Sequence, residues 1–240
     1  MIARMTSARD EILHKLRASL DRHAPFTTSG AQTHEAAPPP VTQVSGDEDL
    51  RVRFMAEVER VKGVVHAAES EDDARQVLRT LLKSHNAQRV TMWDERYIPT
   101  SNIDGLLQEM HITRVQGEHA VVETADTGIT GADSVIAATG TLVLSSGPGR
   151  SRMASLLPPV HIAIVTTSQI VPRLEDYIAA QRAGNVDTFR TASNVTLITG
   201  CSRTSDIEMQ PVFGVHGPLE LHIILIDLNR ASFASSSGHD

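Results

Sequence analysis

The sequence is poor in cysteine, in aromatic residues and in long apolar runs. Cys201 is its one cysteine, so the chain forms no internal disulfide and cannot hold a cysteine-ligated iron–sulfur cluster by itself. Aromatic residues make up 3% of the chain, too few for base-stacking platforms. No apolar run approaches the roughly 18 residues of a bilayer span, and the first residues lack the apolar core of a secretion signal. These absences predict a cytoplasmic protein without a membrane span.

The chain also lacks a basic character. Its formal net charge is -7 and its pI is about 5.9, with no concentrated basic patch, which argues against a nucleic-acid partner. The length of 240 residues permits one large α/β domain, or a core domain with an appendage.

Composition divides the chain into three parts. Ser7 and Asp10 resemble a capping box at the start of a helix over residues 7–22. The stretch that follows, up to Gly46, is rich in Pro, Ser and Thr and reads as a linker. We therefore expect residues 1–46 to form an N-terminal helical arm with its linker, residues 47–230 an α/β domain, and residues 231–240 a disordered tail.

The pattern of the domain alternates between helices and strands. Helical spacing, caps and apolar runs predict helices over 50–63, 70–82, 103–110 and 168–178, and strands at 64–65, 89–93, 112–115, 135–138, 141–145, 160–165, 195–198 and 220–226. This alternation is typical of βαβ units around a mostly parallel sheet, so the predicted fold class is α/β with a Rossmann-like layered architecture.

Two loops carry residues suited to an anionic ligand. The first follows the strand at 195–198 and contains Ser202, Arg203 and Thr204; a helix beginning there would offer free N–H groups to a carboxylate or phosphate. The alternative is that these hydroxyls only cap the helix while the arginine pairs with a nearby carboxylate. The second loop, residues 147–152, carries two guanidinium groups, those of Arg150 and Arg152; its alternative is a solvated turn. It is neither a Walker A loop nor a G-x-G-x-x-G fingerprint.

A small-residue turn lies near the second loop in sequence. Thr139, Gly140 and Thr141 join two strands, and such a turn places backbone donors where an anion could sit. With Arg150 they complete the predicted anion-binding set.

Histidines near strand ends are candidates for acid–base chemistry. His216, between glycines in a loop, is the stronger one, and Glu220 supplies a carboxylate that shares a strand face with His222. For His161 and His222 the alternative is a buried histidine that satisfies a polar partner. We predict no metal site, because no H-E-x-x-H or similarly tight spacing occurs. Cys201 is a candidate nucleophile or, alternatively, a small turn residue.

Five segments in order resemble the LUD domain of the lactate utilization protein C family. They are residues 128–133, 136–144, 156–162, 198–208 and 214–218. The sequence departs from the family pattern twice: Ala138 stands where glutamate precedes Thr-Gly-Thr, and Cys201 stands where proline is usual. The first departure removes a carboxylate, whereas the glycines and Arg203 are retained.

The resemblance implies a fold similar to the sugar-isomerase and CoA-transferase superfamily. It also implies a place in a system that oxidises L-lactate to pyruvate, with iron–sulfur clusters carried by partner proteins and no cofactor on this chain. The expected role is a non-redox subunit that binds a small carboxylate or phosphate ligand. The sequence does not decide whether the chain also forms a homo-oligomer. The alternative is a stand-alone isomerase- or CoA-transferase-like enzyme that uses His216 and Glu220 on a small carboxylate, an acyl-CoA or a sugar phosphate, and a third option is a sensor or scaffold that binds without turnover.

Overall fold

The computed structural model describes residues 8–22, 42–184, 187–204 and 212–227. The chain divides into two compact units between Pro40 and Val41. The first contains α1 (Ala8–Arg22), which confirms the helix expected there; the proposed cap at Ser7 lies outside the described residues. The expected disordered tail also lies outside them.

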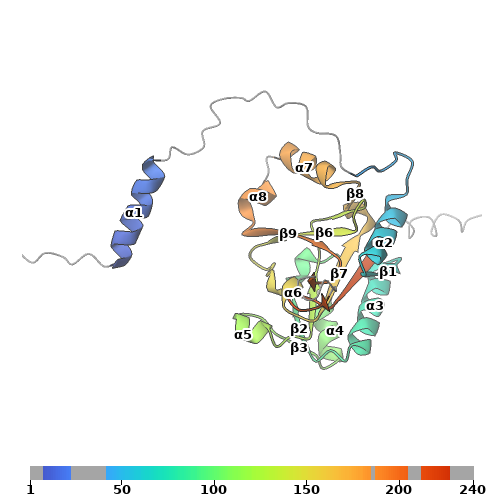
Figure 1. Ribbon diagram of the computed structural model, residues 1–240. Coiled ribbons are helices and arrows are strands. Elements are labelled where there is room, and N and C mark those ends of the chain that lie inside the picture. The colour runs from blue at the N-terminus through green and yellow to red at the C-terminus, as the bar shows by residue number, and fades with distance from the viewer. Residues whose placement is uncertain (1–7, 23–41, 185–186, 205–211, 228–240) are drawn as a thin grey trace, which may run out of the picture. The chain divides into compact units, whose positions relative to one another are not determined.

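A six-stranded parallel sheet forms the centre of the second unit (Figure 1). Its strand order is β1-β12-β7-β4-β2-β3, and every neighbouring pair is parallel. The strands are β1 (Val64–Ala68), β2 (Arg89–Met92), β3 (Thr113–Arg114), β4 (Thr127–Thr130), β7 (Val160–Thr166) and β12 (Glu220–Ile226). The mostly parallel α/β fold expected from the sequence is confirmed.

Helices connect these strands and cover the sheet. The α-helices of the second unit are α2 (Leu50–Arg60), α3 (Glu71–Ser84), α4 (Ile103–Glu109), α5 (His119–Val122), α6 (Met153–Leu156), α7 (Leu174–Ala183) and α8 (Asp187–Thr191), and the 3-10 turns are η1 (Glu95–Tyr97) and η2 (Thr167–Gln169). Helix α3 packs on β1 and β12, and α6 packs on β4 and β7. Asp49 and Ser70 cap α2 and α3 through their side-chain oxygens, which accept from free N–H groups of the first turn.

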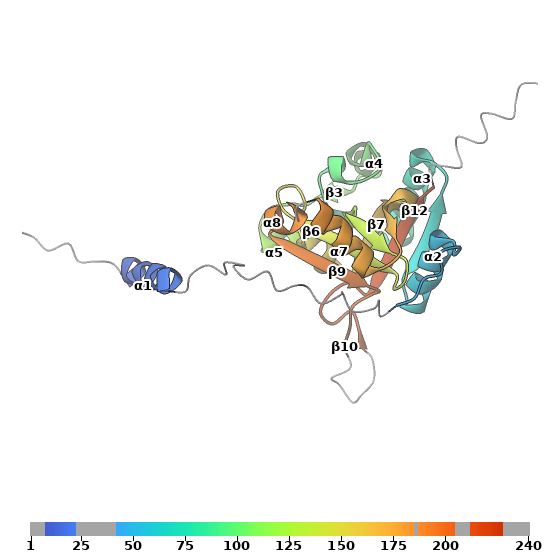
Figure 2. The same ribbon diagram turned by 90° about the horizontal axis from the view of Figure 1, so that it is seen from above.

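A second sheet of four strands lies beside the first. Its order is β8-β5-β6-β9, formed by β5 (Ser134–Ile136), β6 (Thr141–Ser146), β8 (Ile170–Val171) and β9 (Asn194–Thr199). Strand β9 is antiparallel to β6, so it is not a strand of the parallel sheet. Helix α7 packs against β5 and β8. Figure 2 shows the same unit from above, with α7 and β9 in orange.

The prediction of a helix directly after β9 was wrong within the described residues. Thr199 is followed by a turn at Gly200, and Arg203 and Thr204 then form β10, which pairs antiparallel with β11 (Val212–Phe213). Because a β-hairpin uses its N–H groups in the ladder, the expected cluster of free helical donors does not form here.

The predicted helix over residues 168–178 was wrong at its start. Ile170 and Val171 form β8, and α7 begins only at Leu174. Pro172 explains the difference, since proline disfavours helical geometry in the residue before it, and β-branched side chains fit a strand.

The core lies between the sheets and their helices. Strands β7 and β12 contain long apolar runs, and Ile162, Ala163, Ile164 and Val165 of β7 have no exposed surface. Continuous apolar runs of this kind suit parallel strands covered on both faces. Among the described residues, no helix combines the length and apolar character needed to cross a membrane.

Candidate functional site

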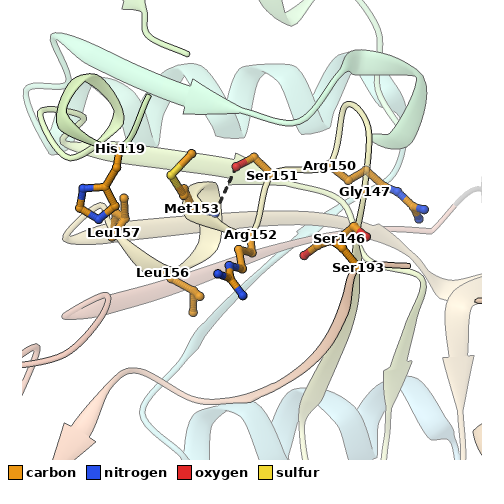
Figure 3. Close-up of a pocket in the computed structure, with 10 residues that line it drawn as sticks. All are labelled: His119, Ser146, Gly147, Arg150, Ser151, Arg152, Met153, Leu156, Leu157 and Ser193. Carbon is orange, nitrogen blue, oxygen red and sulfur yellow. Dashed lines mark hydrogen bonds between the residues drawn. The ribbon is translucent and has the colours of Figure 1, made fainter. Parts of the chain in front are cut away.

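A hollow of about 790 Å³ lies beside the loop that follows β6 (Figure 3). We call it the arginine hollow, and its lining residues are His119, Ser146, Gly147, Arg150, Ser151, Arg152, Met153, Leu156, Leu157 and Ser193. Two guanidinium groups, three hydroxyls and one imidazole therefore surround a space large enough for a small-molecule ligand.

A tight turn shapes one wall of this hollow. The backbone N–H groups of Gly147 and Arg150 each donate to the other residue's carbonyl, at 3.1 and 2.9 Å. Gly149 lies inside the turn with a φ of +76°, a conformation that glycine adopts without strain. The second predicted anion loop is thus a defined turn that lines a hollow.

Arg150 is fixed by its neighbours. Its Nη1 donates to Asp133 Oδ1 at 3.1 Å and to Ser145 Oγ at 2.7 Å, and its guanidinium lies over the Tyr97 ring, 4.8 Å from the centroid. An arginine already paired with a carboxylate has less charge to offer a ligand. Arg150 therefore stabilises the loop that lines the hollow, through its contacts with Asp133, Ser145 and Tyr97.

Arg152 is the more accessible guanidinium. It is exposed, and Figure 3 shows its side chain in the hollow between Leu156 and the hydroxyls of Ser146 and Ser193, while Arg150 points away. Within the described part of the chain, no carboxylate pairs with Arg152. Arg152 is therefore the residue best placed to bind an anion.

A smaller hollow of about 240 Å³ adjoins the first at Leu156. We call it the His161 hollow, and it is lined by Ser155, Leu156, His161, Thr196, Leu197, Ile198, Thr199, Gly200, Cys201, Ser202, His216, Gly217, Pro218 and Leu221. It lies at the amino ends of β7 and β12, where His161 and Leu221 are register partners. The expected position of a ligand site, at the carboxyl ends of parallel strands, is therefore not the position of this hollow.

His161 is the most deeply buried titratable group of that hollow. Its side chain is 1% exposed, and its Nε2 lies 2.9 Å from Thr130 Oγ1, whereas Nδ1 has no partner among the described residues. Burial lowers the pKa of His161 to about 3, because the charged ring would lose its hydration. His161 is therefore neutral near pH 7, with one ring nitrogen unsatisfied.

The structure separates the residues predicted for the first anion loop. Ser202 lines the His161 hollow, together with His216. Arg203 and Thr204 belong to β10, and Arg203 is exposed and lines neither hollow. Arg150 lies in the other hollow, so the predicted set does not form one site.

The small-residue turn between β5 and β6 has a packing role. Thr141 Oγ1 lies 2.7 Å from both Thr139 Oγ1 and Thr199 Oγ1, forming a chain of hydroxyls across β6 and β9. Gly140 has a φ of +63°, and a Cβ there would lie 2.6 Å from the backbone nitrogen of Val58 in α2. The glycine is explained by this close approach, and the turn lines neither hollow.

Glu220 belongs to another group of side chains, which we call the histidine cluster: His66, His85, Glu220 and His222. Glu220 Oε2 lies 3.1 Å from His85 Nε2 and 3.3 Å from His222 Nε2, and His222 Nδ1 lies 3.1 Å from His66 Nε2. The side-chain interaction with His85 lowers the pKa of Glu220, and burial lowers the pKa values of His66 and His222. Because Glu220 contacts these rings and His216 lines the His161 hollow, the two candidate catalytic residues do not share a site.

Sequence reasoning missed several of these residues. Arg152 lies within the predicted loop at residues 147–152 but was not chosen for the anion-binding set, and Ser146 directly precedes that loop. The direction of a side chain in a loop is not encoded by spacing. His85 is 135 residues from Glu220, and nothing in the local pattern links them. Strand periodicity did place Glu220 and His222 on one face, and this signal was sufficient for that pair.

The mostly parallel sheet, its flanking helices and the two adjoining hollows define an α/β domain. The model of the LUD domain matches residues 52–226, and the chain belongs to the LUD domain family.

Relatives agree with this assignment. The chain is 34% identical over 161 residues to the "Lactate utilization protein C" of Halalkalibacterium halodurans, covering 65% of this chain and 70% of that one. It is 29% identical to the protein of the same name from an Exiguobacterium species, covering 91% and 95%. A solved structure, a DUF162 family protein from Deinococcus radiodurans, has a TM-score of 0.56 at 24% identity, covering 74% of this chain and 96% of that one. This last likeness concerns the fold.

Proposed function

We propose that this protein is a non-redox subunit of a lactate-utilisation system that oxidises L-lactate to pyruvate, and that the arginine hollow binds a small carboxylate or phosphate. Membership of the LUD domain family, with relatives named lactate utilization protein C, supports the role in lactate utilisation. The observation that carries the ligand proposal is the accessible guanidinium of Arg152 in a hollow of about 790 Å³.

The electron balance of lactate oxidation and the cysteine content of the chain support a non-redox role. Oxidation of lactate to pyruvate releases two electrons and two protons, which an acceptor must receive. Cys201 is the only cysteine, and a cysteine-ligated cluster needs several thiolates. We therefore propose that iron–sulfur clusters reside on partner proteins and that this chain binds or positions a ligand for them.

The chemistry of the arginine hollow favours an anion. A guanidinium offers several N–H donors in a planar fork that matches a carboxylate or phosphate. The hydroxyls of Ser146 and Ser151 are further donors for the same ligand, whereas the Ser193 hydroxyl donates to the Ser146 carbonyl at 3.2 Å. Leu156 and Leu157 provide apolar surface for the remainder of the ligand. Lactate, pyruvate and phosphate esters all present such an anionic group.

Calorimetric titration of the purified chain with L-lactate, pyruvate and a phosphate ester tests the ligand proposal. Because a hydrogen bond to a charged group contributes about 1.5–3 kcal/mol, Arg152→Ala is expected to weaken binding roughly 10- to 150-fold. Arg182→Ala, at an exposed arginine of α7, is the matched control and retains wild-type affinity.

A third variant, Arg203→Ala, compares the two predicted anion loops. The proposal expects it to bind like the wild type, since Arg203 lines neither hollow. If Arg203→Ala lost binding and Arg152→Ala bound like the wild type, the anion would bind at β10 and not in the arginine hollow. That result would contradict the proposal.

The alternative of a stand-alone isomerase- or CoA-transferase-like enzyme receives no comparable support. It relied on Arg203, His216 and Glu220 acting together. In the structure, His216 lines the His161 hollow, Glu220 contacts His85 and His222, and Arg203 lies on the hairpin. No single described hollow contains all three.

A further inference from the structure

We propose that His85, His222 and Glu220 bind a divalent transition-metal ion of the Zn²⁺ class, with His66 as the hydrogen-bond acceptor that orients His222. The site is separate from both hollows and independent of the proposed role in lactate utilisation. Nδ1 or Nε2 of each histidine and a carboxylate oxygen of Glu220 all lie within 4.8 Å of one another.

The backbone brings these residues together from three elements. His85 is the C-cap of α3, and Glu220 and His222 stand two residues apart at the start of β12, so they share a strand face. His66 lies on the neighbouring strand β1, whose Val64 is the register partner of His222. A helix end and two paired strands therefore hold the rings on rigid elements.

The surroundings of His85 determine which of its nitrogens carries the hydrogen. Nδ1 lies 2.9 Å from the carbonyl oxygen of Leu81, and a carbonyl only accepts, so the hydrogen is on Nδ1. In the neutral ring, Nε2 then presents a lone pair to Glu220 Oε2 at 3.1 Å. Two acceptors face each other at hydrogen-bond distance, and a cation between them, either a proton or a metal ion, removes the repulsion.

The separations of the ligand atoms fit a metal. With metal–nitrogen bonds of about 2.0–2.1 Å, two ligands of a tetrahedral ion lie about 3.3 Å apart. Glu220 Oε2 is 3.1 Å from His85 Nε2 and 3.3 Å from His222 Nε2. Two of the three ligand separations therefore match a tetrahedral ion, and the third is no longer than 4.8 Å.

The outer partners also follow the pattern of metal sites. A ligand histidine usually donates its second ring N–H to a carbonyl or another acceptor, which fixes its orientation. His85 donates from Nδ1 to Leu81, and His222 Nδ1 lies 3.1 Å from His66 Nε2, which accepts when His222 binds metal through Nε2.

The set of donors indicates the class of ion. Two imidazoles and one carboxylate suit Zn²⁺ and related divalent ions better than Ca²⁺ or Mg²⁺, which prefer oxygen ligands. The side chain of Glu220 is 48% exposed, whereas that of His222 is 9% exposed. The carboxylate side of the site therefore faces solvent, and a fourth position remains for water.

Titration of the tag-free full chain with Zn²⁺ and with Co²⁺ tests the proposal. The wild type is expected to bind one Zn²⁺ per chain by calorimetry, and its Co²⁺ complex to show the visible absorption of a low-coordinate N/O site. His66→Phe is expected to weaken Zn²⁺ binding roughly 10- to 100-fold, the usual cost of losing an outer partner. His85→Gln and Glu220→Gln remove ligands and should weaken it further.

Folding and background binding are controlled separately. The side chains of His85 and Glu220 are partly exposed, so we expect His85→Gln and Glu220→Gln to fold. These two variants test the proposal even if a variant of the buried His222 does not fold. His14→Gln, at an exposed histidine of α1, is the matched control and should bind Zn²⁺ like the wild type. Absence of Zn²⁺ uptake by the wild type up to millimolar concentration, or wild-type affinity in His85→Gln and Glu220→Gln, would overturn the proposal in favour of a proton-bridged cluster.

Discussion

At the scale of single residues, His161 shows how burial sets chemistry. The ring is enclosed by the parallel sheet and has one hydrogen-bond partner, Thr130. Burial favours the neutral form, and this holds the pKa of His161 at about 3, against an ordinary value of 6.5. The sequence left two interpretations of His161 open, a site residue or a buried histidine with a polar partner. The structure shows that His161 is buried and that it also lines a hollow.

The pKa of His161 predicts a loss of stability in acid. Below pH 6.5 the unfolded chain binds a proton at this ring while the folded protein does not until about pH 3, so unfolding becomes easier as the pH falls between these values. The contribution is about 1.4 kcal/mol per pH unit, or about 2.5 kcal/mol between pH 6 and pH 4. Urea unfolding at several pH values measures it.

His161→Gln is the informative variant for this prediction. It removes the titrating ring but keeps a polar group near Thr130, so its free energy of unfolding should fall by about 2.5 kcal/mol less between pH 6 and pH 4 than that of the wild type. His14→Gln, at an exposed position, should keep the wild-type slope. Equal slopes in wild type and His161→Gln would show that His161 is protonated in the folded state.

At the scale of elements, local signals in the sequence located many helices and strands. The helix expected from residue 70 onward is α3, and Ser70 caps it, its Oγ accepting from Asp73 N at 3.1 Å. The apolar runs at β7 and β12 were identified as strands. These features depend on residues close in sequence, which is why spacing and capping predict them.

The cap of α3 can be tested by substitution. Ser70→Ala removes the acceptor for the Asp73 N–H and is expected to lower the free energy of unfolding by about 1 kcal/mol. Thr80→Ala, at an exposed site within the same helix, should change stability by less than about 0.5 kcal/mol. Chemical denaturation measures the free energy of unfolding of both variants. If Ser70→Ala has the same free energy of unfolding as the wild type, water or another group caps α3 equally well, and the prediction is wrong.

Other elements could not be predicted from local signals. A strand was predicted at residues 195–198, but the antiparallel pairing of β9 with β6 depends on residues some 50 positions away. Strand β4 contains Gly128, and a Cβ there would lie 1.7 Å from the carbonyl oxygen of Ala154 in α6. The glycine lowers strand propensity, yet the close approach of α6 requires it, so tertiary packing overrides the local preference.

At the scale of the whole molecule, strand β12 separates two chemical environments. Leu221 lines the His161 hollow, whereas Glu220 and His222, on the opposite strand face, join the histidine cluster beside α3. The sequence-based hypothesis grouped Glu220 with His216 in one candidate site, whereas His216 lines the His161 hollow. A strand alternates its side chains, so residues adjacent in sequence serve different sites, and this is why the candidate site was only partly predicted.

The central claim is that the chain supports lactate utilisation through its arginine hollow. The most direct measurement is growth of the deletion strain on L-lactate as sole carbon source, complemented with wild type, Arg152→Ala or the control Arg182→Ala at equal protein levels. The account predicts that deletion abolishes growth on lactate, that wild type and Arg182→Ala restore it, and that Arg152→Ala does not. Normal growth of the deletion strain, or full rescue by Arg152→Ala, would contradict it.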